Sequence, residues 1–419
     1  MAPRNPLRRL RRKLSPYIGR AQAFYAISRI FPVRRRVLVL SDSRATLSGN
    51  LAYLVEELRT AAPELEVRTV LRASLKSARQ RGDAFRLPWL IATSKFILLD
   101  DYYPYIYQLP MRRGVHLIQV WHAAGAFKRV GYSRVGLPGG PGPRSISHRG
   151  YTDTITSSES IRGDYAEAFR MQLEDVHALG VPRTDVFFDE GLAARTAAAV
   201  RERYGIRPEQ RVVLYAPTFR GNGQRTARFD FELIDWDALA AALGDDTVML
   251  VKMHPFVRRV PDIFAGHPQL VDVSAEREIN DMLFAADVLV TDYSSVIFEY
   301  ALLRRPIVFH VPDLEEYQGS RDFYYPFDRY LCGTTTRSTA ELAAALTEPR
   351  LDRERLDEFV RYFMSACDGG STGRVVRRLI LDRLDEPASA RPPARWSKEV
   401  LAAAAAADDD PAAMREEDA

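Results

Sequence analysis

The feature that most constrains the fold is a repeated alternation of short apolar segments with amphipathic helical patterns. Short runs rich in Val, Ile and Leu are typical of strands buried on both faces of a parallel sheet. Two such series are separated by a connection at about 180–208. We therefore expect an α/β chain with two Rossmann-like domains facing a cleft. The expected strands are 37–42, 95–101, 117–123, 151–158, 212–217, 248–255, 270–274, 288–295 and 306–312.

The chain length of 419 residues predicts two or three domains. Ligands in open parallel sheets bind outside the carboxyl ends of the strands, so polar residues there are the candidates for function. The expected divisions are a basic segment at 1–36, an N-terminal Rossmann-like domain at 37–190, a C-terminal Rossmann-like domain at 191–385 and a low-complexity tail at 386–419.

The first 36 residues are unlike the rest of the chain in charge. They carry eleven of the 59 Lys and Arg residues and no acid, so the other 48 basic residues are outnumbered by 55 acids. Leucines at helical spacing alternate with basic residues, a pattern that favours a helix lying on an anionic membrane. The alternatives are a solvated arm or one that binds nucleic acid, and Pro16 interrupts the pattern. The residues concerned are Leu7, Leu10, Leu14 and Ile18, with Arg8, Arg9, Arg11, Arg12 and Lys13.

The cellular compartment is predicted from cysteine content and hydropathy. Cys332 and Cys367 fit no metal-binding spacing, and so few thiols in a chain of this length indicate a reduced, intracellular protein. No apolar run approaches the roughly 18 residues of a spanning helix, and the basic start does not lead into a signal peptide. We expect the chain to remain in the cytoplasm.

A first polar cluster, from Trp121 to Gly125, follows the strand LIQV. His122 at a strand end, before small residues that let a ligand approach the backbone, suits a general base. The alternative is a hydrogen-bonded structural histidine.

The second half of the chain carries two similar clusters. Arg220 and a hydroxyl follow the strand that ends in LYAP, a pairing that could bind phosphate, although a solvated loop arginine is the alternative. Lys252 and His254 leave the next strand two residues apart, so they share a face, and Pro255 ends that strand. Their alternative is a structural role.

A further cluster, Thr291–Asp292–Tyr293–Ser294–Ser295, opens a helix after ADVLV. Ser294 and Ser295 are N-cap types, and the free N–H groups of a helix start can bind an anion. Glu299 lies about one turn further on, where a carboxylate could bind ribose hydroxyls. Simple capping is the alternative for the serines, and a solvated helix face is the alternative for Glu299.

Together these clusters resemble one family, the CDP-glycerol glycerophosphotransferases of teichoic-acid and capsule synthesis. The resemblance runs from about residue 90 to 380 and includes LLDDYYP (98–104) and LGVPRTD (179–185). The first motif of the family reads WHGTPLK or WHAAGAFK, and this chain has the second form. The other matching segments are LYAPTFRG, VKMHPF and INDMLFAADVLVTDYSSVIFEYALLRRPIVFHVPDLEEYQGSRDFYYPFD.

The resemblance implies a GT-B fold, a CDP-glycerol or CDP-ribitol donor, and CMP as leaving group. The family needs both of its motif histidines for transfer, and the matching positions are His122 and His254. Glu299 replaces the Asp more often found there, which leaves its ribose role open. An undecaprenyl-linked acceptor would explain the basic start and a location on the inner face of the plasma membrane. We expect no nucleic-acid partner.

The roles that follow divide the site into two sides. We expect His122 to take the acceptor proton, and His254, Lys252 and Arg220 to stabilise phosphate charge. The remaining donor-side residues are Thr291, Asp292, Ser294, Ser295 and Glu299 in the C-terminal domain, and the acceptor-side residues are Asp100, Asp101, Gly125 and Lys128 in the N-terminal domain.

We expect no dependence on a tightly bound metal ion, and two alternative functions stay open. No DxD-like pair follows a strand in the donor half, so we expect no tightly bound ion or cofactor. One rival is a GT-B glycosyltransferase that uses a nucleotide sugar. The other is a non-catalytic nucleotide-binding scaffold protein, against which the presence of both histidines argues.

Overall fold

The computed structural model describes residues 16–74, 82–137, 140–221, 226–257, 260–276, 278–320 and 322–386, with the side chains of 16–18 and 318–320 left out. These residues form two compact units. The first unit comprises 16–123, 129–183 and 366–386, and the second comprises 124–128 and 184–365.

The first unit is built on a six-stranded sheet in the order β2-β1-β3-β4-β5-β6, with every neighbouring pair parallel. Parallel strands are covered by helices on both faces, which explains why β3 and β4 are almost entirely buried. The strands are β1 Arg34–Ser41, β2 Glu66–Leu71, β3 Ser94–Leu99, β4 His116–Gln119, β5 Asp153–Ile155 and β6 Val176–His177; the helices are α2 Pro16–Ser28, α3 Gly49–Ala61, α4 Asp83–Thr93, α5 Pro104–Tyr107, α6 Arg162–Phe169 and α15 Ser371–Leu379.

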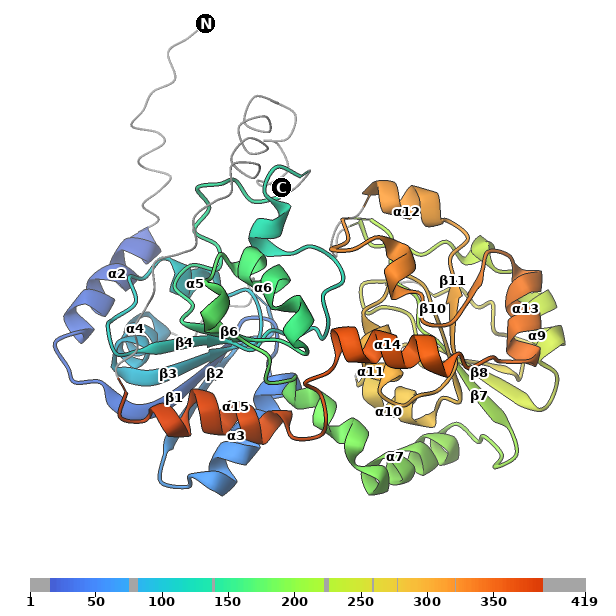
Figure 1. Ribbon diagram of the computed structural model, residues 1–419, viewed down its shortest axis with the longest axis horizontal. Helices are drawn as coiled ribbons and strands as arrows, with labels where there is room; N and C mark the ends of the chain where they lie inside the picture. Colours follow the sequence, from blue (N-terminus) through green and yellow to red (C-terminus); the bar gives the residue numbers. More distant parts are fainter. Residues whose placement is uncertain are drawn as a thin grey trace, which may run out of the picture. The chain divides into compact units, whose positions relative to one another are not determined.

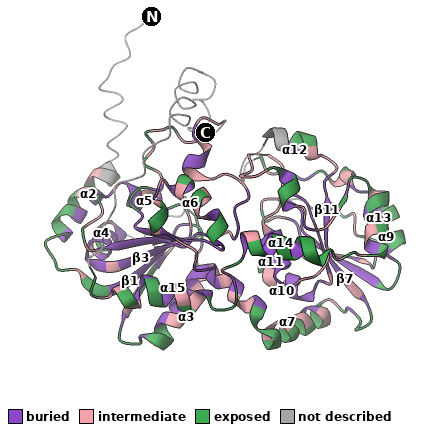
Figure 2. Cartoon of the chain, viewed as in Figure 1, coloured by how far each residue is buried: buried purple, intermediate pink, exposed green. Residues whose placement is uncertain are grey.

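The second unit repeats this plan with a six-stranded parallel sheet in the order β12-β11-β10-β7-β8-β9. Figure 2 shows buried strands in its interior and exposed outer faces on its helices. The strands are β7 Arg211–Tyr215, β8 Thr247–Val251, β9 Leu270–Asp272, β10 Val288–Thr291, β11 Ile307–His310 and β12 Thr334–Thr336; the helices are α7 Glu190–Arg203, α9 Trp236–Leu243, α10 Ile279–Ala285, α11 Val296–Ala301, α12 Leu314–Ser320, α13 Thr339–Thr347 and α14 Arg353–Phe363.

The C-terminal helix α15 belongs to the first unit although it follows the second in sequence. It lies beside α3 (Figure 1), and Val375, Val376 and Leu379 enter the same apolar core as Leu54 and Leu58. Burial of such side chains contributes about 1.5–3 kcal/mol each. The returning chain therefore stabilises the first sheet.

A glycine makes this return possible. Gly180 has φ +84°, and a Cβ there would lie 2.2 Å from Ser371 Oγ and 2.4 Å from the Ala366 carbonyl oxygen. Any side chain at this position would push the returning segment away from the loop that follows β6.

The structure divides the chain differently from the sequence prediction. The expected break at 190–191 falls at residue 184, residues 366–385 belong to the first unit, and residues 124–128 belong to the second. Apolar periodicity locates strands and helices but carries no information on which sheet a returning helix covers. The short edge strands β6 and β12 were not predicted, because two or three residues show no period.

Several N- and C-terminal predictions lie outside the described residues. These include residues 7–15 of the expected basic helix and all but the first residue of the tail at 386–419. Within the described part, α2 begins at Pro16, a residue type favoured at the first helical turn. None of the helices in the described ranges combines the length and apolar character that crossing a bilayer requires.

Candidate active site

His122 follows β4 by three residues, at the carboxyl edge of the first sheet. Its Nδ1 lies 3.3 Å from the Asp100 carbonyl oxygen and 3.6 Å from Asp101 Oδ1. A carbonyl oxygen only accepts hydrogen bonds, so we assign the ring proton to Nδ1. The lone pair is then on Nε2, and the side chain is 41% exposed. This is the tautomer that a general base requires.

The two predicted acidic residues of this edge are not equivalent. Asp100 is buried, and its Oδ2 lies 3.1 Å from Arg44 Nε. Burial raises the pKa of the Asp100 carboxyl, while Arg44 opposes that rise. Asp101 is 30% exposed and its Oδ1 accepts the Tyr102 N–H at 2.7 Å. The structure therefore places the side chain of Asp101, and only the carbonyl of Asp100, against the imidazole.

The loop that carries His122 is held in an unusual conformation. Trp121 has φ +48°, a left-handed value that costs a bulky residue about 1–2 kcal/mol. Asn50 Nδ2 donates to the Trp121 carbonyl at 2.7 Å, and Asn50 Oδ1 accepts the Arg183 N–H at 2.9 Å. Sequence reasoning missed Asn50, because a single Asn at the start of α3 reads as a cap.

His254 stands three residues beyond β8, at the carboxyl edge of the second sheet. Its Nδ1 accepts the Phe256 N–H at 3.2 Å, which assigns the ring proton to Nε2. The rings of Phe219 and Phe256 lie 4.6 and 4.7 Å from the imidazole, centroid to centroid. Burial, and then the positive charges of Lys128 and Lys252, lower the pKa of His254 to about 4. The imidazole is thus a neutral N–H donor at neutral pH.

Lys252 is buried beside this histidine, and its ammonium donates to the Glu276 carbonyl oxygen at 2.6 Å. Burial lowers the pKa of Lys252, and the charge of Glu276 opposes that change. In this structure the cation therefore holds the loop beyond β9.

Arg220 is the centre of an ion-pair cluster, so the alternative of a solvated loop arginine is wrong. Its Nε and Nη2 donate to Asp313 at 2.6 and 3.0 Å, and its Nη1 donates to Asp292 Oδ2 at 2.9 Å. Asp292 Oδ1 also accepts the N–H groups of Thr218 and Tyr293. Arg220 and Asp292 together join the loop after β7 to the loop after β10.

The cluster after β10 is mostly buried. Thr291 Oγ1 donates to the Ala216 carbonyl at 2.7 Å, and Ser294 Oγ accepts the Val296 N–H at 3.4 Å, at the start of α11. Ser295 directly precedes that helix. Glu299 is 2% exposed, which excludes the solvated helix face considered as its alternative.

Gly125 and Lys128 lie in the second unit, which corrects their expected place in the N-terminal domain. Gly125 has φ +69°, and a Cβ there would lie 2.4 Å from the Phe298 ring. The Tyr330 hydroxyl donates to the Ala126 carbonyl at 2.8 Å. The motif that begins at Trp121 therefore contributes its histidine to one unit and its next residues to the other.

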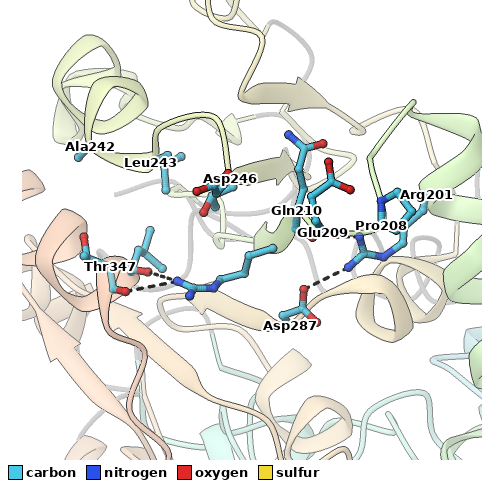
Figure 3. Close-up of a pocket in the computed structure, with 12 residues that line it drawn as sticks. Arg201, Pro208, Glu209, Gln210, Ala242, Leu243, Asp246, Asp287 and Thr347 are labelled. Carbon is cyan, nitrogen blue, oxygen red and sulfur yellow. Dashed lines mark hydrogen bonds and ion pairs between the residues drawn. The ribbon is translucent and has the colours of Figure 1, made fainter.

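The second unit also contains a separate pocket of about 760 Å³, and Figure 3 shows the residues that line it. It lies at the amino ends of β7 and β8 and is lined by none of the predicted site residues. Arg211 Nη1 donates to the Leu346 carbonyl at 2.8 Å, and Arg201 Nη2 donates to Asp287 at 3.3 Å. These arginines bind a helix C-terminus and a carboxylate, as structural residues do. Within the described part of the chain, no group of three or more His, Cys, Asp or Glu could hold a metal ion.

Two parallel sheets with polar residues beyond their carboxyl ends define a GT-B-like protein. The wall teichoic acid polymerase TagF, in a variant soaked with CDPG, has the same fold, with a TM-score of 0.73 and 22% identity over 91% of this chain and 97% of that one. The family profile described as CDP-glycerol:poly(glycerophosphate) glycerophosphotransferase matches residues 23–381. The chain belongs to this family.

Two curated relatives come from Bacillus spizizenii. A teichoic acid poly(ribitol-phosphate) polymerase is 41% identical over 87% of this chain, which spans 59% of that protein's length. A teichoic acid ribitol-phosphate primase is 33% identical over 84% of this chain and 93% of its own length. The family expectation and the GT-B fold expectation are both confirmed.

Proposed function

We propose that the chain transfers a polyol phosphate from a CDP-alcohol to a hydroxyl of a teichoic-acid-type acceptor and releases CMP. The observation that carries the proposal is the opposite hydrogen-bond surroundings of two histidines in a family of CDP-alcohol transferases, from which we assign complementary tautomers. His122 offers a lone pair on Nε2, whereas His254 offers an N–H on Nε2. A transfer reaction needs one group of each kind.

In the proposed reaction, His122 Nε2 removes the proton from the acceptor hydroxyl as its oxygen attacks the distal phosphorus. A phosphorus–oxygen bond forms to the acceptor, and the bond between that phosphorus and the CMP oxygen breaks. His254 Nε2–H donates to a phosphate oxygen and stabilises charge in the transition state.

The other donor-side residues act on the nucleotide and its phosphates. Ser294 and Ser295 would bind the diphosphate near the first turn of α11. Glu299 is 2% exposed, so it would accept from ribose hydroxyls only if its carboxylate became accessible. Arg220 and Lys252 already bind protein oxygens, so we now assign them to holding the loops that carry Ser294 and His254. Direct phosphate contact would require them to exchange those partners.

We propose CDP-ribitol as the preferred donor. The relatives at 41% identity are ribitol-phosphate polymerases, whereas a poly(glycerol phosphate) polymerase is 27% identical. The test is a donor screen with CDP-ribitol, CDP-glycerol and UDP-sugars, with CMP release and product mass as the readouts. Transfer of a hexose would establish the glycosyltransferase alternative. Tight CMP binding without turnover of either CDP-alcohol would establish the binding-protein alternative.

We also propose that the acceptor is lipid-linked and that the chain works on the inner face of an anionic membrane. Support comes from a surface on α2, the turn after it, and α4. Ile27, Ile30, Phe31 and Phe85 are 44–76% exposed there, and the rings of Phe24 and Phe85 lie 4.3 Å apart. Exposed apolar residues rimmed by cations are typical of proteins that bind lipid surfaces. The exposed cations of these segments are Arg20, Arg29 and Arg86, and the first two residues of β1 add Arg34 and Arg35.

Vesicle flotation tests this surface. The triple variant Ile30→Ser, Phe31→Ser, Phe85→Ser should release the chain from anionic vesicles and leave CMP release from a soluble acceptor analogue unchanged. Binding of the full chain to anionic vesicles should weaken steeply as the salt concentration rises. Deleting residues 1–15 should weaken this binding and reduce its salt dependence, since each basic residue contributes about 1 kcal/mol. The variant Leu173→Ser, Phe188→Ser removes equally exposed side chains from other elements and serves as the control. Full binding by both the triple variant and the deletion would refute the proposal.

A further inference from the structure

Gln119, the last residue of β4, is fully buried and joins two neighbouring strand ends. Its Oε1 accepts the Trp121 N–H at 2.9 Å, and its Nε2 donates to the Asp101 carbonyl oxygen at 3.2 Å. The same Nε2 donates to the Tyr151 hydroxyl at 2.8 Å. One amide thus holds the residue before His122 and the backbone of Asp101 at a fixed separation.

The side chain of Asp101 is fixed from its other side. Its Oδ1 accepts the Tyr102 N–H at 2.7 Å and faces His122 Nδ1 at 3.6 Å. Asp100 cannot take this place, because its carboxylate is turned toward Arg44 Nε at 3.1 Å. Of the two adjacent acids, Asp101, whose side chain is 30% exposed, is the partner of the imidazole.

We propose that Asp101 is a positioning residue that supports His122, and that Gln119 is the clamp that keeps the pair aligned. This inference rests on the proposed function. The carboxylate favours the Nδ1–H tautomer, which leaves Nε2 free to accept the hydroxyl proton. When that proton arrives, the ring becomes a cation, and the adjacent negative charge stabilises it. The proton remains on Nε2 until it passes to water after CMP has left.

The pair contributes to proton transfer and not to nucleotide binding. Loss of Asp101 should therefore lower kcat and leave KM for the CDP-alcohol unchanged. The losses in kcat caused by removing Asp101 and by removing His122 should also be non-additive. Because Asp101 acts through the imidazole, its removal should lower kcat no further once His122 is gone.

The kinetic test uses the full chain and the CDP-alcohol that it turns over. Asp101→Asn should lower kcat by about 10²-fold, at the low end of the general-base range, and Asp101→Glu should recover part of it. Gln119→Glu can still accept the Trp121 N–H but repels the Asp101 carbonyl, and it should lower kcat similarly. Glu64→Gln removes an exposed carboxylate from the same unit and is the control. An unchanged kcat for Asp101→Asn, or additive losses in Asp101→Asn, His122→Ala, would overturn the inference.

A second readout is independent of activity. Nitrogen NMR of the imidazole, assigned by the loss of its signal in His122→Gln, reports which ring nitrogen carries the proton. Wild type should show Nδ1–H, and Asp101→Asn and Gln119→Glu should increase the Nε2–H fraction. An Nε2–H imidazole in wild type, or an unchanged ratio in both variants, overturns the inference whatever the reaction is. A wild-type chain that turns over no CDP-alcohol and yet shows the expected ratios would refute the proposed function and support the pairing.

Discussion

His122 and His254 each stand three residues past a parallel strand, but their surroundings are opposite. The first ring faces a carbonyl and a carboxylate oxygen, whereas the second receives an N–H and lies against two phenyl rings. Oxygen acceptors direct the proton of His122 to Nδ1, and the amide donor directs that of His254 to Nε2. Two histidines at equivalent positions on similar sheets can therefore have different tautomers, and so different chemical roles, because their hydrogen-bond partners differ.

The largest expected effect is that of His122→Ala. Because this ring is assigned to the acceptor proton, transfer should fall by about 10²–10⁴-fold while affinity for the CDP-alcohol stays near that of wild type. Single-turnover rates and calorimetry measure the two quantities. Loss of donor affinity in this variant would place His122 on the phosphates and break the comparison.

His254→Ala should reduce transfer by about 10²–10³-fold, as expected for loss of a donor to developing charge. It should also weaken donor binding, which separates it from His122→Ala. Since the pKa of His254 is about 4, its protonation should not limit the rate between pH 5.5 and 8. Donor affinity equal to wild type in this variant would reverse the two roles.

A third histidine, His148 in the first unit, extends the comparison, because it is buried and has a lowered pKa, as His254 has. Burial lowers the pKa of His148 to about 4, with the charge of Asp101 opposing. The unfolded chain binds this proton near pH 6.5 and the folded chain does not, so stability is lost as pH falls from 6.5 toward 4. The loss amounts to about 3 kcal/mol at 1.36 kcal/mol per pKa unit.

Urea unfolding between pH 4.5 and 7.5 measures this dependence. His148→Asn keeps a residue type that tolerates the φ of +59° and removes the titrating ring. Its unfolding free energy should vary less with pH than that of wild type. Identical pH profiles for the two proteins would contradict a neutral, buried His148.

Gly125→Ala tests the segment that passes into the second unit just after His122. The new Cβ would overlap the Phe298 ring, and the alanine would have to keep φ at +69°. We therefore expect the free energy of unfolding to fall by about 1–3 kcal/mol. Gly205→Ala is the control in the same unit, because Gly205 has φ +63° and nothing within 4 Å of a Cβ. Equal losses for both variants would show that backbone strain, and not the contact with Phe298, accounts for the effect.

The smallest expected effect belongs to the serines before α11. Ser294→Ala, Ser295→Ala should weaken CMP binding by only about 1–2 kcal/mol, near the lower limit for a hydrogen bond to a charged group, because the backbone N–H groups remain. Ser338→Ala removes the cap of α13 in the same unit and should leave CMP affinity unchanged. Undiminished binding to the double serine variant, measured by calorimetry, would remove these residues from the donor side.

The sequence determined the fold class and the position of each motif. Apolar runs of strand length leave few alternatives to a parallel sheet, and the polar residues that end them must lie at its carboxyl edge. The TDYSS block and both histidine motifs resemble the motifs of a family of CDP-alcohol transferases, and the prediction of that family rests on this resemblance.

Only the tertiary structure decided which unit each segment joins and what each polar side chain contacts. Residues 124–128 belong to the second unit, where Gly125 lies against Phe298, and α15 belongs to the first unit, where it packs in the core with α3. These partners are distant in sequence, so no local pattern reveals them. The sequence also did not reveal that Arg220 bonds to Asp292 and Asp313, or that Lys252 bonds to the Glu276 carbonyl oxygen. The tautomer of His122 and the clamp that Gln119 makes to Asp101 depend on distances of 3.2–3.3 Å between residues at the ends of two neighbouring strands, which no local pattern encodes.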